Sequence, residues 1–209
     1  MPKREPKTIQ FKRCVVDVFA RRLGPAWVEA GPANGLRLER SFPWGHGGVS
    51  LGMTYRGLPS TNVHLVYGLR VASLSPLLDR LLRADGYEPN GFFDVWQDSV
   101  NRPLRGKART SSVQDYNHED VEHVFDDLLA GAEDELIGFF ARYGDLFELR
   151  KSFEEDDHTF FAIGRDSIIV AIDFALGDVE HLARYRAAAL PPWRQKALDR
   201  DIAALGLSL

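Results

Sequence analysis

Three consecutive stretches of alternating apolar and polar residues decide the fold class of this chain: Leu36-Arg-Leu38-Glu-Arg40-Ser-Phe42, Val49-Ser-Leu51-Gly-Met53-Thr-Tyr55 and Val63-His-Leu65-Val-Tyr67-Gly-Leu69-Arg-Val71. Alternation with a period of two is typical of strands that bury one face. The links at 43–48 and 57–60 are too short for a parallel crossover, so we expect antiparallel neighbours. A short strand at Trp27-Val28 and another near 92–96 would complete a meander of four to five strands.

Apolar spacing of three and four residues predicts helices on both sides of this sheet. One helix runs from a Thr8 cap to about Leu23, and another opens at Ser75-Pro76. From about residue 118 the spacing is helical, with predicted helices at 118–143, 145–153, 167–176 (capped by Asp166), 179–190 and after Pro191-Pro192. The predicted fold is therefore α+β: an N-terminal helix, an antiparallel β-meander of four to five strands, and a C-terminal helical bundle packed on one sheet face.

The chain of 209 residues is predicted to form a single domain over residues 8–209. Residues 8–98 hold the first helix and the sheet, and residues 113–209 the helical part. Between them, residues 99–112 lack periodicity and indicate a basic, exposed loop, which is either functional or disordered. Residues 1–7 are predicted to be disordered.

The alternation also assigns the two faces of the sheet. The predicted buried face carries Leu36, Leu38, Phe42, Val49, Leu51, Met53, Tyr55, Val63, Leu65, Tyr67, Leu69 and Val71. The opposite face, which carries Arg37, Glu39, Ser50, Thr54, His64 and Arg70, is expected to be wet or covered by a partner.

Composition narrows the function classes. An apolar fraction of 44% with 27% charged residues is ordinary for a globular protein. A net charge of −4 gives no reason to expect binding to nucleic acid or to an anionic membrane. No apolar stretch is long enough for a signal peptide or a membrane span, and the single cysteine, Cys14, is expected to be reduced and buried in a helix. These features predict a cytoplasmic protein.

The helix at 118–143 has the most polarised surface in the sequence, because no lysine or arginine lies between Arg109 and Arg142. Its outward side is predicted to collect seven carboxylates: Glu119, Asp120, Glu122, Asp126, Asp127, Glu133 and Asp134. Such a surface can attract a basic partner and speed the encounter. The alternative interpretation is the solvated face of an ordinary helix.

Evidence for a cofactor or metal site is weak, and none is predicted. Glu119, His123 and Asp127 are spaced four apart and could hold a divalent metal if further ligands approached. The glycine-rich stretch Trp44–Gly48 lacks the lysine and hydroxyl of a phosphate-binding loop, so a hairpin loop is favoured over an anion site.

The sequence offers a single candidate catalytic residue. His64 on the open sheet face, near Arg70 and Glu39, could work as an acid or base. Cys14 is expected within a core helix, away from any histidine-bearing loop, and no nucleophile elbow is present.

The order of elements resembles a bacterial family of uncharacterised helix–antiparallel-sheet–helix domains. The resemblance rests on Phe11–Leu23, the three alternating stretches and the closing Ile168–Asp178. Members of such families often occur as candidate immunity proteins, which bind and neutralise a cognate toxin. The resemblance implies no catalytic residues.

Our first hypothesis is accordingly a cytoplasmic protein-binding module, an immunity protein whose acidic helix face binds a toxin with a basic surface. The alternative is a small hydrolase or transferase that uses His64 or the Glu119/His123/Asp127 stripe, with or without a metal. A scaffold subunit that forms a homo-oligomer is a third hypothesis; the oligomeric state itself is not predictable from the sequence.

Overall fold

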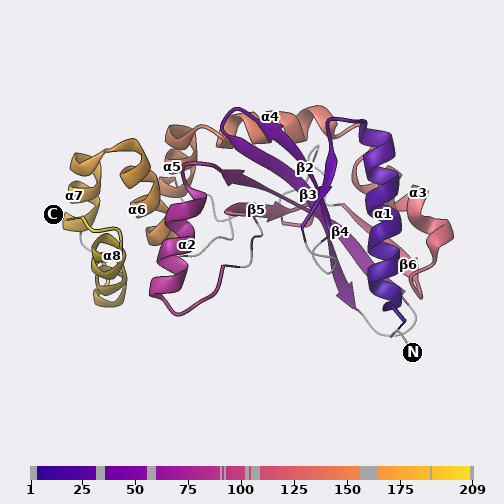
Figure 1. Ribbon diagram of the computed structural model, residues 1–209, viewed down its shortest axis with the longest axis horizontal. Coiled ribbons are helices and arrows are strands. Elements are labelled where there is room, and N and C mark those ends of the chain that lie inside the picture. The colour runs from indigo at the N-terminus through magenta and orange to yellow at the C-terminus, as the bar shows by residue number, and fades with distance from the viewer. Residues whose placement is uncertain are drawn as a thin grey trace.

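The computed structural model describes residues 4–31, 36–55, 60–89, 91, 93–101, 104, 109–155, 164–188 and 190–207. These residues form one antiparallel sheet framed by helices (Figure 1). The order of the elements is α1 (Lys7–Leu23), β1 (Val28–Ala30), β2 (Arg37–Phe42), β3 (Gly45–Tyr55), β4 (Ser60–Val71), α2 (Ser75–Ala84), β5 (Val95–Asp98), β6 (Thr110–Gln114), the 3₁₀ turn η2 (His118–Asp120), α3 (Val121–Leu128), α4 (Glu133–Tyr143), α5 (Leu146–Glu154), α6 (Arg165–Leu176), α7 (Val179–Ala187) and α8 (Pro192–Ala204). The predicted α+β class is confirmed.

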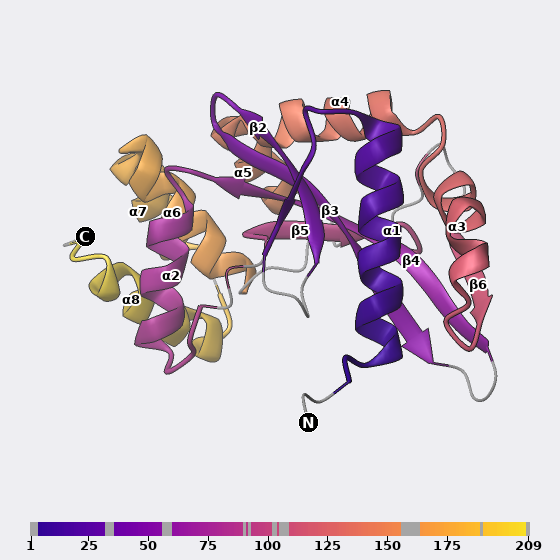
Figure 2. The same ribbon diagram turned by 45° about the vertical axis from the view of Figure 1, so that its right-hand side comes forward.

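The sheet is organised around the long strand β4 (Figure 2). Strands β1, β2, β3 and β4 follow one another in space as in sequence, all antiparallel. The other edge of β4 is shared: β5 pairs with its second half and β6 with its first half. The described sheet therefore has six strands, and β6 takes in residues 110–112, which the sequence predicted as part of the basic loop.

The face of the sheet that the sequence predicted to be buried is covered by helices. Register places Leu38, Val49 and Tyr67 side by side, with Leu51 next to Leu65. Helices α1, α3 and α4 contact this inner face of the sheet, and the Tyr67 and Phe139 rings meet edge to face at 5.0 Å. The side chain of Tyr55, which was predicted to share the buried face, lies outside the described residues.

The outer face is not open at its centre, contrary to the prediction. Phe93 lies over Gly48 and Gly68, so that a Cβ on either glycine would come within 2.7 Å of the Phe93 side chain. On the same face, Arg37 is only 5% exposed and Ser50 8% exposed. Around His64 the same face carries a polar cavity.

The glycine-rich stretch is a strand and not a hairpin loop. Phe42 pairs with Gly45, so the turn consists of Pro43 and Trp44 alone. A Cβ on Gly47 would lie 2.6 Å from the ring of Phe140. These positions lack side chains because aromatic rings from other elements occupy the space above the strand.

The predicted helix over 118–143 is broken into three pieces. After η2 and α3, the chain turns at Gly131, whose φ of +70° favours glycine, and α4 begins at Glu133. The sequence pattern ran through the break because Leu128, Leu129, Ala132 and Leu136 are all buried. Asn117 caps the first piece, η2, because its side chain accepts a hydrogen bond from the Glu119 backbone N–H.

The last three helices pack with α2 and α5 at one end of the sheet (Figure 1). Gly177 ends α6 in the left-handed conformation, and the Asp178 side chain caps α7. Asp166 does not cap α6: it lies in the first turn, after Gly164, and its carboxylate binds Arg194 and the Tyr185 hydroxyl. No helix of the described part has the length and apolar character needed to cross a membrane.

Candidate functional site

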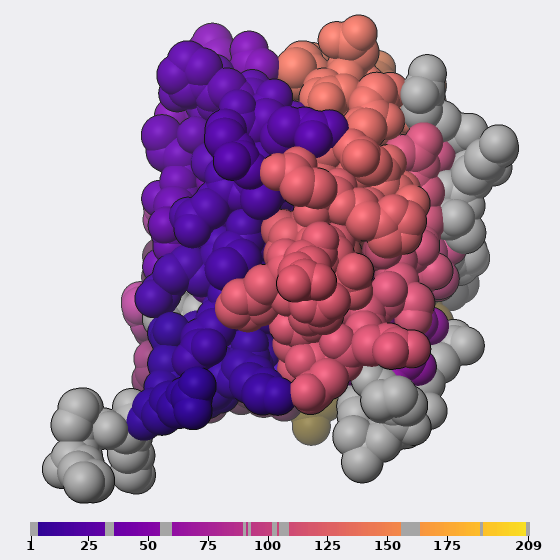
Figure 3. All heavy atoms as spheres, turned by 90° about the vertical axis from the view of Figure 1, so that its right-hand side faces the viewer, coloured from indigo at the N-terminus to yellow at the C-terminus, as the bar shows by residue number. Residues whose placement is uncertain are grey.

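The predicted acidic face begins on η2 and α3. Helix α3 lies beside α1, and these two helices make one continuous surface (Figure 3). Across their seam Glu122 accepts hydrogen bonds from Arg21 at 2.7 Å and from Arg22 at 2.8 Å. Arg22 also donates to Asp126 at 2.6 Å, and its guanidinium lies 4.3 Å from the centre of the Phe125 ring. Two of the seven predicted partner-binding carboxylates are thus already paired with arginines of α1.

The other predicted carboxylates have different surroundings. Glu119, Asp120, Glu133 and Asp134 form no ion pair with any residue that the structure describes. Asp127 lies 3.0 Å from His123 Nε2 and accepts a hydrogen bond from the Ser111 hydroxyl at 2.9 Å. Because of the break at Gly131, Glu133 and Asp134 belong to the first turn of α4, where the positive end of the helix dipole favours them.

Charge remains strongly unbalanced on this surface. Nine aspartates and glutamates lie between Asp115 and Glu135, with no lysine or arginine among them. Helix α1 supplies Lys7, Arg21 and Arg22, which bind Asp115, Glu122 and Asp126. The surface that includes Glu119, Asp120, Glu133 and Asp134 is called the acidic surface below.

The Glu119/His123/Asp127 stripe does not assemble as a metal site. His123 and Asp127 meet on α3, whereas Glu119 lies in the 3₁₀ turn before it. Within the described ranges, no three histidine, cysteine, aspartate or glutamate side chains are arranged to hold a metal ion.

His64 lines a polar cavity of about 230 Å³ together with Thr54, Asn62, Asp98 and Thr110. Burial lowers the pKa of His64, and the charge of Asp98 opposes that shift. Asp98 is held in place because it accepts hydrogen bonds from the backbone N–H groups of Val100 and Asn101. Arg70 and Glu39, which were expected near His64, lie further along the sheet: Arg70 is six residues away on β4, which is about 20 Å.

Cys14 has a histidine neighbour that the sequence did not indicate. Its Sγ lies 3.7 Å from Nδ1 of His118, which belongs to η2, and Cys14 is half-buried instead of buried. The expectation that Cys14 stands away from any histidine is therefore wrong. The two residues are 104 positions apart, so only the packing of α1 against η2 and α3 could reveal the pair.

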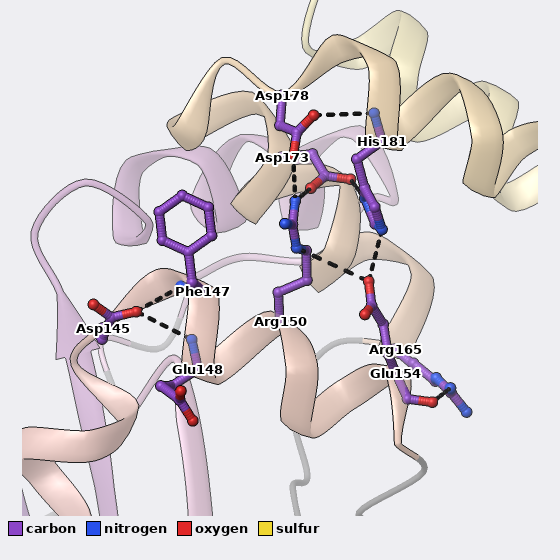
Figure 4. A network of polar contacts seen from close by, with 9 residues as sticks. All are labelled: Asp145, Phe147, Glu148, Arg150, Glu154, Arg165, Asp173, Asp178 and His181. Carbon is purple, nitrogen blue, oxygen red and sulfur yellow. Dashed lines mark hydrogen bonds and ion pairs between the residues drawn. The ribbon is translucent and has the colours of Figure 1, made fainter.

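A buried polar network joins α5, α6 and α7 (Figure 4). Arg150 donates to Asp173 at 2.7 Å and to Asp178 at 2.8 Å. The two ring nitrogens of His181 each lie 2.7 Å from a carboxylate oxygen, Nδ1 from Asp173 and Nε2 from Glu154. This geometry suits an imidazolium that donates through both nitrogens.

The network holds α5, α6 and α7 together and is buried except at one edge. The Asp173 side chain is fully buried, and Arg150 is 14% exposed; hydrogen bonds to both aspartates raise the pKa of Arg150 against the opposing effect of burial. At the edge, Phe147 is 59% exposed and its ring lies 5.5 Å from the Arg150 guanidinium. The sequence did not indicate this network, because Asp173 stands alone in an apolar run.

Comparison of the chain with protein-family models, with curated proteins and with solved structures finds no match. The resemblance to helix–sheet–helix immunity-type domains therefore stays a prediction.

Proposed function

We propose that the chain is a protein-binding module of the cytoplasm, an immunity protein that neutralises a toxin with a basic surface. The observation that carries the proposal is the uncompensated charge of the acidic surface. Glu119 is exposed on η2, which contacts α3, and Asp134 is exposed on α4, which contacts β4. A rigid surface of one sign attracts a partner of the opposite sign and raises its association rate by about 10- to 1,000-fold.

The arginines of α1 shape this surface further. Since Arg21 and Arg22 hold Glu122 and Asp126 at hydrogen-bond distance, these two carboxylates serve the α1–α3 seam. Basic side chains of the partner would instead engage Glu119 and Asp120 on one side of the seam residues and Glu133 and Asp134 on the other.

The test compares two double charge reversals with the same change in net charge. Glu119→Lys with Asp134→Lys alters the acidic surface, whereas Glu155→Lys with Glu180→Lys alters exposed carboxylates of the C-terminal helices. Proteins retained by the wild-type chain from cells of its source are identified by quantitative mass spectrometry, and the purified partner is then measured by calorimetry and stopped flow. We expect the first variant to lower the association rate at least about tenfold, with a weaker dependence on salt.

Two outcomes separate the parts of the proposal. Equal affinity of both double variants for the partner would remove the acidic surface from the argument. If expression of the partner arrests growth and co-expression of the wild-type chain restores it, the immunity role is supported; a harmless partner would leave protein binding without that role.

A second candidate function, a small hydrolase or transferase, rests on His64 beside Asp98 in a polar cavity. A histidine whose pKa is lowered by burial is neutral near pH 7 and can accept a proton. Turnover of p-nitrophenyl esters or phosphates that His64→Gln abolishes, and that His46→Gln on the same sheet face retains, would support it. Metal analysis of the purified protein tests the metal-dependent form.

A further inference from the structure

A second cavity, of about 490 Å³, lies between the start of α1 and the inner face of β3 and β4. Ile9, Leu51 and Met53 give it apolar walls, and Thr61 and Tyr116 contribute hydroxyl-bearing side chains. The volume falls within the range of about 300–1,000 Å³ that is typical of small-molecule sites. This cavity and the His64 cavity lie on opposite faces of the same two strands.

Lys12 is the charged residue of this lining and has no partner among the residues that the structure describes. It forms no hydrogen bond or ion pair with any residue in the described part of the chain. Its helical neighbours three and four positions away are Thr8, Ile9, Val15 and Val16, so α1 offers it no carboxylate. Lys12 is half-buried, and this burial lowers its pKa, so its ammonium group lacks part of the solvation that it would have in water.

Tyr116 lines the cavity at the cost of backbone strain. Its φ is +55°, and that of Asp115 before it is +46°. Aspartate tolerates this region, but a bulky residue such as tyrosine seldom adopts it. The surroundings hold the strained turn in place: Asp115 binds Lys7 at 2.8 Å, and the Tyr116 ring packs 6.0 Å from that of Phe11. Strained residues that persist in this way cluster at ligand sites.

We propose that this cavity binds a small apolar carboxylate, with Lys12 as the counter-ion of the carboxylate and the Ile9, Leu51 and Met53 side chains around the apolar body. An apolar body is required by the walls, and an anionic head by the unpaired ammonium. A carboxylate there restores to Lys12 the charge partner that α1 does not provide, and charge-assisted hydrogen bonds of this type are the stronger ones in proteins.

Octanoate is the probe, with octanol and octyltrimethylammonium as matched ligands that change only the head group. Binding is measured by calorimetry and by saturation-transfer NMR. Lys12→Met removes the charge and keeps the length of the side chain, and Arg13→Met makes the same change at the next, exposed residue. Circular dichroism and thermal unfolding confirm that both variants fold.

We expect wild-type protein to bind octanoate more tightly than either matched ligand. Lys12→Met should weaken octanoate at least about tenfold and leave octanol unchanged, because it removes a charge-assisted hydrogen bond. Arg13→Met should bind all three ligands as wild type does. The proposal is overturned if wild-type protein does not bind millimolar octanoate, if octyltrimethylammonium binds as well as octanoate, or if folded Lys12→Met retains the octanoate affinity.

Discussion

Asp94 is predicted to make the protein less stable as the pH rises from 4 to 6. Its carboxylate joins three elements: the Val71 backbone N–H at the end of β4 donates to it at 2.9 Å, and the Ser75 hydroxyl at the start of α2 donates at 2.5 Å, while Asp94 itself precedes β5. Burial raises the pKa of Asp94 from 3.8 to about 6, in spite of these two hydrogen bonds and the charge of Arg70, and the neighbouring Asp79 raises it further.

The sign and size follow from linkage. Between pH 3.8 and 6 the folded chain keeps a proton on Asp94 that the unfolded chain loses, so folding is favoured most below pH 3.8 and least above pH 6. Since one unit of pKa corresponds to 1.36 kcal/mol, the loss is about 3 kcal/mol. Asp94→Asn removes the titration, and its amide oxygen can accept both hydrogen bonds. The variant should therefore be more stable than wild type above pH 6, by up to about 3 kcal/mol.

The assay is urea unfolding, followed by circular dichroism, in half-unit steps from pH 3.5 to 7.5. The difference between Asp94→Asn and wild type isolates this group from the other carboxylates. Two further variants shift the transition in opposite directions: Ser75→Ala removes a bond that lowers the pKa of Asp94, and Asp79→Asn removes a charge that raises it.

A difference curve that is flat between pH 4 and 6 would refute the reasoning. So would one in which Asp94→Asn is most favourable at low pH, because that result would mean that the native state prefers the charged form.

Three further predictions concern the packing of the molecule. Arg150→Met should lower the free energy of unfolding by about 3–5 kcal/mol, because it removes a partner from the buried Asp173 carboxylate. Lys151→Met, at the next, exposed position, should change the free energy of unfolding by less than about 1 kcal/mol. Equal effects of the two variants in urea unfolding would contradict the structural role of the buried Arg150–Asp173 pair. Gly52→Ala should cost about 1–3 kcal/mol, because the new Cβ would lie 2.2 Å from His64 Nε2, and His64→Ala should relieve most of that cost; additive losses in the double variant would argue against the contact. Glu122→Gln should change stability by no more than about 1 kcal/mol, since its arginine pairs are solvent-exposed; a much larger loss in thermal unfolding would show that the α1–α3 seam depends on them.

The alternation of apolar and polar side chains predicted most of the sheet, but it failed where glycines interrupt the pattern. Leu36, Leu38, Val49, Leu51 and Leu65 are buried as their period predicts. At Gly47 and Gly48 the period is invisible, because the rings of Phe140 and Phe93 occupy the space where side chains would stand. The break before α4 was hidden for the opposite reason: the turn residues Leu129 and Ala132 are as fully buried as those of the helices.

The residues that surround the candidate sites could not be predicted from the sequence. Spacing along one element placed His123 next to Asp127, because both lie on α3. It could not place Arg22 beside Asp126, Cys14 beside His118 or Asp98 near His64, since each pair depends on how separate elements pack. Lys12 shows the same limit, because its lack of a partner depends on what β3 and β4 bring to α1.

The contacts of α2 with α6 and α8 can form only late in the synthesis of the protein. Leu78 and Leu81 of α2 are almost fully buried, and Asp85 just after α2 pairs with Arg200 of α8. Helix α8 ends 120 residues after α2, at Ala204 compared with Ala84, which a ribosome takes about 6–24 s to add at about 5–20 residues per second. Until α6 and then α8 have been made, the apolar side of α2 lacks the C-terminal helices that contact it. We expect chaperones to bind the nascent chain most strongly when its synthesis is stalled within this interval.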